Sequence, residues 1–217
     1  MLKYENIVKP SADQWEFVIR GMRNPLNSWS RSDSYILNNG SGEFFILGKT
    51  DHQLAFQLSR AGSDHGKYLR MLPVMVDVIA PFYWWKQFDS YKIGTVANST
   101  STMHRISQSE LDLEDFSLEN LSDGEIQEVI IPTIERINSI IRLIHSEKNT
   151  LEGKEIKNLE LKIYQLLPDS YNQRRSVLLN YEVLKNMYGS RRNHKLPEWR
   201  KFLTLINRLE HPELITL

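Results

Sequence analysis

The residues best suited to chemistry lie between His65 and His104, above all in a run of small hydroxyl and amide side chains over residues 95–102. Such a run contributes little to a core, but it offers many hydrogen-bond donors and acceptors to a polar ligand. His65, between Asp64 and Gly66, could act as a hydrogen-bonding or acid–base group. A histidine beside an acidic neighbour at a helix start is more often structural, so both interpretations stay open.

Aromatic and basic side chains precede this run. Trp84 and Trp85 could stack on a planar ring, or could be core residues of an amphipathic helix. Lys86 and Lys92 could hold a phosphate, or could be solvated surface lysines. The region therefore has the side chains of a polar-ligand site, each with a structural alternative.

Four arginines lie in two short runs, Gln173-Arg-Arg175 and Ser190-Arg-Arg192, at what we predict to be the two ends of one helix. Arg191 and Arg192 near a helix C-terminus suit the helix dipole without any ligand. The six histidines show no close metal-ligand spacing, so no metal site is expected. The sequence has no P-loop, no G-x-G-x-x-G and no G-x-S-x-G motif, so the common nucleotide and hydrolase signatures are missing.

The elements that position these residues are predicted to be mainly helices, with strands in the first half of the chain. Apolar periodicity and capping residues predict helices over residues 11–21, 51–61, 82–91, 122–145, 154–167, 171–188 and 197–209. Alternating residues predict strands over 43–47 and 72–79, the second with Asp77 as an unusual acidic member. The pattern indicates a helix-rich α+β protein.

Composition narrows the class of protein. The 217 residues include 27 basic and 27 acidic side chains, and a net charge of zero argues against a general nucleic-acid binder. The chain has no cysteine, which excludes disulfides, thiolate metal sites and a cysteine nucleophile. No secretory start and no apolar run of roughly 20 residues is present. We expect a single cytoplasmic domain over residues 1–217, without a membrane or nucleic-acid partner.

Two blocks of the sequence together resemble the flavin-dependent thymidylate synthases. The family's first block is a Gly-His start, a strand, Ala-Pro, and a helix ending in R-H-R-x-x-S-x-N-x-x-S-x-R-Y. The residues that fall on it are His65, Ala80-Pro81, Gln87, Ser90-Tyr91-Lys92 at the R-H-R triplet, Thr95, and, after one inserted residue, Asn98, Ser101 and Met103-His104.

The second block of the family is an L-P pair followed by N-A-R-S-L-x-N-F-x-x-L-R and a last helix. The residues that fall on it without a gap are Leu167-Pro168, Asn180, Leu184, Asn186 and Arg191, with Glu198-Trp199 at the start of the last helix. The resemblance spans most of the chain, from about Arg20 to Phe202.

The resemblance implies an α+β fold in which a mixed or antiparallel sheet packs with several long helices, and a homotetramer with active sites shared between subunits. It implies FAD as cofactor, methylenetetrahydrofolate and NADPH as cosubstrates, and dUMP as the pyrimidine nucleotide methylated in dTMP synthesis. An active protein would be a flavin-dependent methyltransferase. Carried over by position, the nucleotide-binding candidates are Gln87, Ser101 and Arg191, and the cofactor-binding candidates are His65, Lys92, Asn98 and Asn180.

Several of the family's arginines are replaced. The first two triplet positions are Ser90-Tyr91, Met103 replaces the last signature arginine, Glu182 replaces the arginine of N-A-R, and Tyr164 replaces one before Leu-Pro. Other cations such as Lys86, Arg70 or Arg105 could compensate, or the enzyme could modify a different pyrimidine. The scaffold could instead be a non-catalytic nucleotide-binding or regulatory module. A third hypothesis is an interaction protein that uses the aromatic helix at 82–91 as an oligomer surface.

Overall fold

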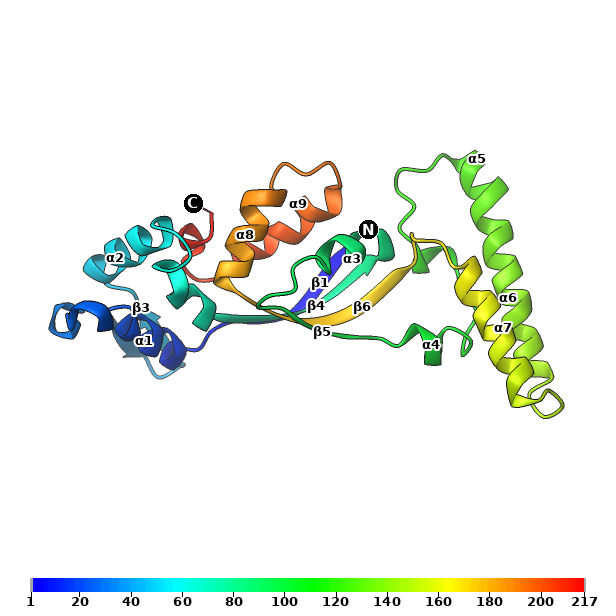
Figure 1. Ribbon diagram of the computed structural model, residues 1–217, viewed down its shortest axis with the longest axis horizontal. Coiled ribbons are helices and arrows are strands. Elements are labelled where there is room, and N and C mark those ends of the chain that lie inside the picture. The colour runs from blue at the N-terminus through cyan, green and yellow to red at the C-terminus, as the bar shows by residue number, and fades with distance from the viewer. Residues whose placement is uncertain (1, 217) are drawn as a thin grey trace. The chain divides into compact units, whose positions relative to one another are not determined.

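The computed structural model describes residues 2–216, except for the side chains of Met103 and His104, so the match of those two residues to the family's Arg-Tyr lies outside the described part (Figure 1). The strands are β1 (Lys3–Val8), β2 (Tyr35–Asn38), β3 (Glu43–Ile46), β4 (Pro73–Pro81), β5 (Val96–Ser99) and β6 (Asn172–Asn180). The helices are α1 (Ala12–Gly21), α2 (Lys49–Arg60), α3 (Phe82–Phe88), α4 (Thr102–Arg105), α5 (Asp123–Glu125), α6 (Ile131–Ser146), α7 (Gly153–Leu166), α8 (Tyr181–Arg191) and α9 (Pro197–Leu203).

The chain forms two compact units, each made of three stretches of sequence. Unit 1 comprises Met1–Lys3, Val78–Ser90 and Asn98–Arg175, and unit 2 comprises Tyr4–Asp77, Tyr91–Ala97 and Ser176–Leu217. A four-stranded sheet has the order β1-β4-β6-β5, and β2 and β3 form a separate antiparallel ribbon. The fold class is α+β, as predicted. The prediction of a single domain over residues 1–217 stays a prediction.

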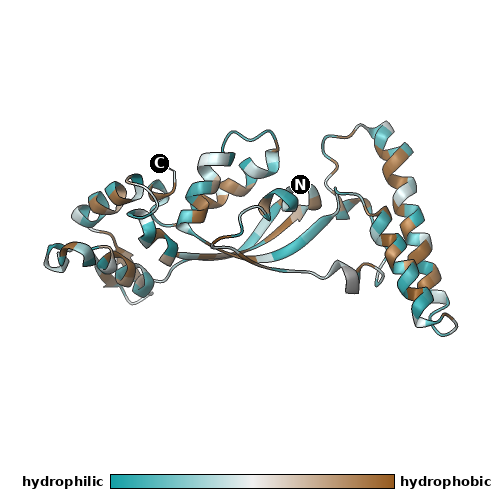
Figure 2. Ribbon diagram, in the orientation of Figure 1, coloured by the Kyte–Doolittle hydropathy of each residue, from teal (hydrophilic) through white to brown (hydrophobic). Residues whose placement is uncertain are grey.

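The core of unit 1 is built around the paired helices α6 and α7. Ser122 caps the helical stretch before α6 through a capping box with Glu125, and a π-helical turn, Ile126–Ile130, follows. Five isoleucines at helical spacing are buried together with Ile163 of α7, namely Ile130, Ile134, Ile137, Ile141 and Ile144. Figure 2 shows hydrophobic residues along this helix pair. Asn138 is also buried in this core. Its side-chain oxygen accepts a hydrogen bond from the backbone N–H of Leu111, and its side-chain nitrogen donates one to the Leu111 carbonyl, both at 2.8 Å. These two bonds give partners to the polar groups of Asn138 and to the backbone groups of Leu111 inside an apolar core.

Unit 2 places α1 on the β2–β3 ribbon. Ser11 caps α1, and the structure adds a capping box in which the Gln14 side chain accepts from the backbone N–H of Ser11. Trp15, Val18 and Ile19 form the buried face of α1, and the Trp15 ring stacks on Phe45 with centroids 6.0 Å apart. The helices α2, α8 and α9 complete this unit, together with a 3₁₀ helix over Gly66–Met71.

An ion pair between Arg23 and Asp51 lies inside unit 2. Arg23 is 3% exposed and Asp51 is 0% exposed, and Arg23 Nε donates to Asp51 Oδ1 at 2.5 Å. The other carboxylate oxygen accepts from the hydroxyls of Ser32 and Ser34, each at 2.6 Å. A buried charge is tolerated only when it is paired and hydrogen-bonded in this way. The pair therefore ties α2 to the turns that follow α1.

The predicted helix over residues 171–188 is wrong in its first half. Residues Asn172–Asn180 form strand β6, in which buried Val177 and Leu179 alternate with exposed Ser176 and Leu178. Asn180 then caps α8, which runs through Gly189 to Arg191. The arginines at 174 and 175 therefore lie on a strand and not at a helix end.

The ends of two other predicted helices also differ. The helix predicted over 82–91 ends at Phe88, where Asp89 is the C-cap residue. The helix predicted over 197–209 is α-helical only to Leu203 and continues as a 3₁₀ helix over Thr204–Arg208. Within the run of hydroxyl and amide residues over 95–102, Val96–Ser99 forms the exposed strand β5.

Candidate functional site

Arg191, the last residue of α8, is held by two aromatic side chains of unit 2. Its Nε donates a 3.0 Å hydrogen bond to the Tyr91 hydroxyl. Its guanidinium lies 5.7 Å from the centroid of the Tyr91 ring and 5.0 Å from that of Trp199. Trp199 is fully buried and meets Tyr91 edge-on. Ring faces attract a cation, so this half-buried guanidinium is positioned by π systems and one phenol.

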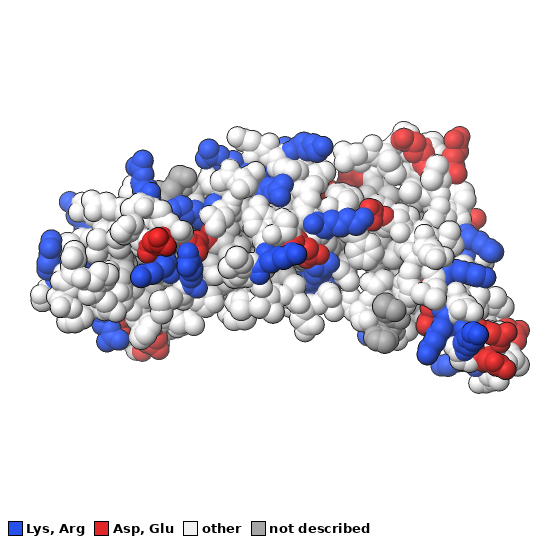
Figure 3. All heavy atoms as spheres, viewed as in Figure 1, with Lys and Arg blue, Asp and Glu red and all other residues white. Residues whose placement is uncertain are grey.

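The surroundings of Arg191 are electropositive. Burial, together with the charges of Arg191 and Lys195, lowers the pKa of His194 below its usual value. Basic side chains are visible over α8 and α9 on the face drawn in Figure 3. The positive charges of Arg191 and Lys195 beside this imidazole make the corner suited to an anionic group.

Asn180 has a structural role at the start of α8. Its side-chain oxygen accepts a 2.9 Å hydrogen bond from the backbone N–H of Val183, which is an N-cap contact. Gly94 faces this cap with a φ of +77°, and a Cβ on it would lie 2.9 Å from Asn180 Nδ2 and 3.0 Å from Val183 Cγ2. Only glycine fits this approach without strain. The segment with Lys92 therefore lies against the N-terminus of α8.

Glu182, which stands at the arginine position of the family's N-A-R, is paired with Arg70 of this chain. Both carboxylate oxygens of Glu182 accept hydrogen bonds from Arg70, one of them from Nη2 at 3.2 Å. Glu182 raises the pKa of Arg70 through these bonds and its charge. In unit 1, Lys86 forms an ion pair with Asp169 at 2.5 Å. Two of the three cations considered as replacements for missing arginines are thus engaged by carboxylates of this chain.

In unit 1, the first residues of β6 lie next to Thr100 of the hydroxyl- and amide-rich run over residues 95–102. Gln173 donates through Nε2 to the Thr100 carbonyl at 2.9 Å, and Thr100 N–H donates to the Arg174 carbonyl at 2.9 Å. Arg175 lies 4.2 Å from the centroid of the Trp85 ring and donates to Asp89 at 2.7 Å. Sequence reasoning missed this neighbourhood because it placed these residues on a helix. Only the burial alternates along this strand, with Val177 and Leu179 buried and Leu178 exposed, and the sequence Ser-Val-Leu-Leu has no polar–apolar alternation that would have indicated a strand.

The remaining predicted site residues are mostly exposed. In unit 2, His65 precedes the 3₁₀ helix at Gly66, and Lys92 lies between α3 and β5, both exposed. In unit 1, Asn98 is exposed on β5, and Ser101 is exposed at the start of α4 without a side-chain capping bond. Gln87 is half-buried on α3, where Ser90 donates to its carbonyl at 2.7 Å.

The predicted residues divide between the units. Gln87, Asn98 and Ser101 belong to unit 1, whereas His65, Lys92, Asn180 and Arg191 belong to unit 2. Within unit 2, the structure brings Asn180 close to the chain that follows Lys92. It also brings Arg191 onto Tyr91, the residue before Lys92.

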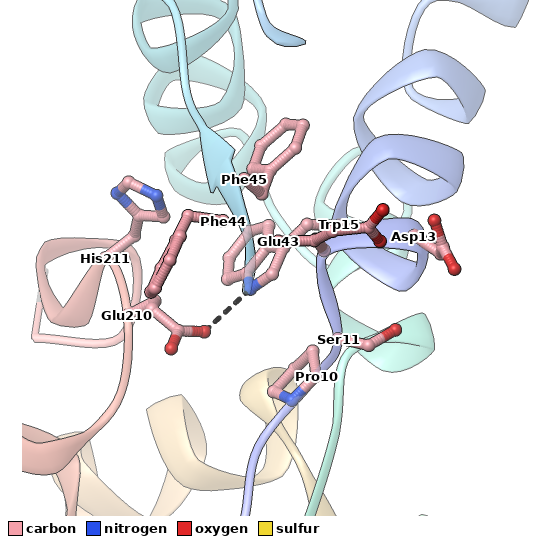
Figure 4. A pocket seen from close by; sticks show the side chains of 10 residues that line it. Pro10, Ser11, Asp13, Trp15, Glu43, Phe44, Phe45, Glu210 and His211 are labelled. Atoms are coloured by element: carbon pink, nitrogen blue, oxygen red, sulfur yellow. Dashed lines mark hydrogen bonds between the residues drawn. The ribbon is translucent and has the colours of Figure 1, made fainter. Parts of the chain in front are cut away.

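Three of the surface pockets that the described residues form are lined by none of these seven side chains. One, of about 340 Å³, lies in unit 2 beneath α1 and β3. Figure 4 shows Trp15, Phe44 and Phe45 around it, with Trp15 Nε1 donating to Glu210 at 3.1 Å. His211 meets Trp15 edge-on, and its pKa is lowered chiefly by burial. Among the side chains that the structure describes, which exclude that of His104, no group of three or more His, Asp or Glu is arranged to hold a metal. No helix in the described part of the chain is long and apolar enough to cross a membrane.

The structure closely matches two solved structures along almost its whole length. One is a crystal structure of flavin-dependent thymidylate synthase ThyX from Helicobacter pylori complexed with FAD and dUMP, with a TM-score of 0.65 and 15% sequence identity, covering 99% of this chain and 97% of that one. The other is a ThyX structure from the same organism with FAD and dUMP, with a TM-score of 0.64, 14% identity and the same coverage. The fold is that of flavin-dependent thymidylate synthase.

This likeness to flavin-dependent thymidylate synthase concerns the fold. No protein-family model matches the sequence, and no curated protein sequence matches it. The flavin-dependent thymidylate synthase fold was nevertheless predicted from the two sequence blocks, which indicates that their spacing carries structural information although several arginines are replaced.

Proposed function

We propose that this protein is a divergent flavin-dependent thymidylate synthase-like protein that binds FAD and a pyrimidine nucleotide such as dUMP. The observation that carries the proposal is the match of 99% of this chain to 97% of a ThyX chain whose structure contains both ligands. The match extends over both chains, so the shared fold supports the proposal by analogy, and the residues of the site must carry the rest of the argument.

Arg191 is the main nucleotide-binding residue in this proposal. A guanidinium held by Tyr91 and Trp199 keeps its orientation before a ligand arrives, so little side-chain entropy is lost on binding. Arginine donates paired hydrogen bonds to phosphate oxygens. Gln87 and Ser101 supply the remaining nucleotide contacts in the proposal.

FAD is assigned to His65, Lys92, Asn98 and Asn180. The exposed ammonium of Lys92 and the amide of Asn98 are donors of the kind that flavin phosphates and ring carbonyls accept, so the side chains present fit the group. Bound FAD would supply the electron transfer, while these residues hold and orient it. Asn180 contributes through the amide nitrogen that its capping bond leaves uninvolved.

The rest of the proposal follows the resemblance. Methylenetetrahydrofolate would donate the carbon, NADPH would supply reducing equivalents, and the product would be dTMP. A homotetramer with shared sites and a cytoplasmic location belong to the same proposal.

The direct test is ligand binding by the purified full-length chain. We expect flavin absorbance after incubation with FAD and gel filtration, and a rise in melting temperature with dUMP. We also expect folate-dependent conversion of dUMP to dTMP. A protein that takes up no FAD and shows no dUMP-dependent thermal shift would overturn the proposal.

A second candidate is a non-catalytic nucleotide-binding or regulatory module. The observation that favours it is the pairing of Glu182 with Arg70 and of Lys86 with Asp169, since a cation held by a carboxylate is less available to a phosphate. This candidate predicts a thermal shift with dUMP but no methylation of any pyrimidine. Turnover of a pyrimidine nucleotide would dispose of it.

A further inference from the structure

A second potential ligand groove lies on unit 2 and is lined by none of the residues assigned above. It has a volume of about 340 Å³ and is lined by Phe17, Arg20 and Gly21 of α1 and by Asn24 and Trp29 of the turns that follow. Phe17 is 55% exposed and Trp29 is 49% exposed. Two large aromatic side chains on one groove, half open to water, are typical of a surface that something planar covers.

The walls of this groove are fixed before any ligand arrives. Trp29 Nε1 donates a 2.8 Å hydrogen bond to Asn24 Oδ1, which sets the orientation of the indole. The Arg20 guanidinium lies 5.6 Å from the centroid of the Phe17 ring. At Gly21, an added Cβ would meet no atom within 4 Å, so the space above this residue is open. The aromatic walls and the open floor are thus already in place.

Charge selects the kind of molecule that fits. Arg20 is the charged residue in the described lining of the groove, so the lining carries one positive charge. Aromatic faces favour a flat ring, and an exposed guanidinium favours a carboxylate or phosphate.

We propose that this groove binds a small planar aromatic anion, with the ring against Trp29 and Phe17 and the anionic group on Arg20. The groove shares no lining residue with the FAD and dUMP assignments, so the proposal does not depend on them.

Trp29 provides a readout specific to this groove. The other tryptophans, Trp15, Trp84, Trp85 and Trp199, are at most 1% exposed, so acrylamide quenches mainly Trp29 fluorescence. We would use AMP as the probe, with adenosine as the ring without the anion and ribose 5-phosphate as the anion without the ring. AMP is expected to protect Trp29 from acrylamide, adenosine to protect it more weakly, and ribose 5-phosphate not at all.

Variants separate the contributions of shape and charge. Gly21→Leu places a side chain in the open space above residue 21 and is expected to abolish the protection of Trp29 by AMP. Arg20→Gln is expected to weaken AMP binding about tenfold, since a charge-assisted contact is lost, and to leave adenosine binding unchanged. Arg60→Gln is the matched control, because Arg60 stacks on Phe56 at 5.8 Å at the end of α2 outside the groove. Arg60→Gln is expected to change neither AMP binding nor adenosine binding.

Two results would overturn the proposal. One is equal acrylamide quenching of Trp29 with and without AMP up to millimolar concentrations. The other is AMP protection that survives both Gly21→Leu and Arg20→Gln in proteins with unchanged melting temperature. Binding of FAD and dUMP, measured on the same variants, is expected to stay at the wild-type level, so failure of either proposal can be recognised separately.

Discussion

Two arginines of unit 2 are fixed by opposite means. Arg23 is 3% exposed and is paired with the Asp51 carboxylate, which two serine hydroxyls also bind. Arg191 is half-buried and is held by the Tyr91 phenol and two ring faces. A carboxylate cancels the charge of the first arginine, whereas its aromatic neighbours orient the second and leave its charge to act on His194. The first arrangement is suited to stability and the second to binding an anion.

The largest expected effect comes from breaking the buried pair. Asp51→Ala leaves the Arg23 charge buried and unpaired, so we expect the free energy of unfolding to fall by about 3–5 kcal/mol. Urea denaturation followed by circular dichroism measures this change. Glu16→Ala removes an exposed carboxylate of α1 and should stay within about 0.5 kcal/mol. A loss below about 1 kcal/mol for Asp51→Ala would show that the pair is not structural.

Arg191→Ala is expected to weaken dUMP binding about 100-fold, because the proposed charge-assisted contact of its guanidinium with the phosphate is lost. The melting temperature should change little, and calorimetry measures the affinity. Arg192→Ala is the matched control, since Arg192 is exposed and stacks on Tyr188 at 5.6 Å. Equal affinities of the two variants would retire the assignment of Arg191.

The dependence of stability on pH tests the role of the Asp51 carboxylate in its pair with Arg23. Burial opposes ionisation of Asp51, but the hydrogen bonds of Ser32 and Ser34 and the charge of Arg23 lower the pKa of Asp51 below its usual 3.8 overall. A carboxyl group whose pKa is lowered by folding stabilises the protein above pH 3.8, and that stability is lost as the pH falls below it.

The isosteric variant Asp51→Asn has an amide in place of the carboxyl group and cannot take up a proton in this pH range. In the pH range below about 3.8, the free energy of unfolding of the wild type should fall more steeply than that of the variant, by up to about 1.4 kcal/mol per pH unit for one proton. Urea denaturation at a series of acidic pH values tests this difference. Parallel curves for the two proteins would contradict the assigned role of Asp51.

The smallest expected effect is at the start of α8. Asn180→Ala removes the N-cap acceptor for Val183 N–H and should lower the free energy of unfolding by about 1 kcal/mol. Asn186→Ala, at an exposed position of the same helix, should cause no loss. If FAD uptake also falls in Asn180→Ala but not in Asn186→Ala, Asn180 has a role in binding as well as in capping.

Local signals in the sequence predicted much of the helical structure. The capping boxes at Ser11 and Ser122 depend on residues three apart, so they can be found without tertiary information. Strand β6 was missed because Gln, Arg and Leu are good helix formers, and its conformation is set by pairing with strands far away in sequence. Strand β1 was missed because Lys3-Tyr-Glu-Asn-Ile-Val8 shows no apolar alternation and its conformation depends on pairing with the distant strand β4.

The candidate site was less predictable than the fold. Family spacing pointed to Arg191 and Asn180, but not to the Tyr91 phenol or to the capping role of Asn180. The ion pairs of Glu182 with Arg70 and of Arg23 with Asp51 join residues 112 and 28 positions apart. Contacts of this kind arise only when the chain is folded, so no motif marks them.

The interleaving of the two units has a consequence for biosynthesis. Everything that belongs to unit 1 has been translated once Arg175 is added, whereas unit 2 needs the final stretch from Ser176 onward to join Tyr4–Asp77. Domains generally fold in the order in which they leave the ribosome. Here Tyr4–Asp77 must wait for Ser176–Leu217 before unit 2 can be completed, and no simple truncation yields either unit intact.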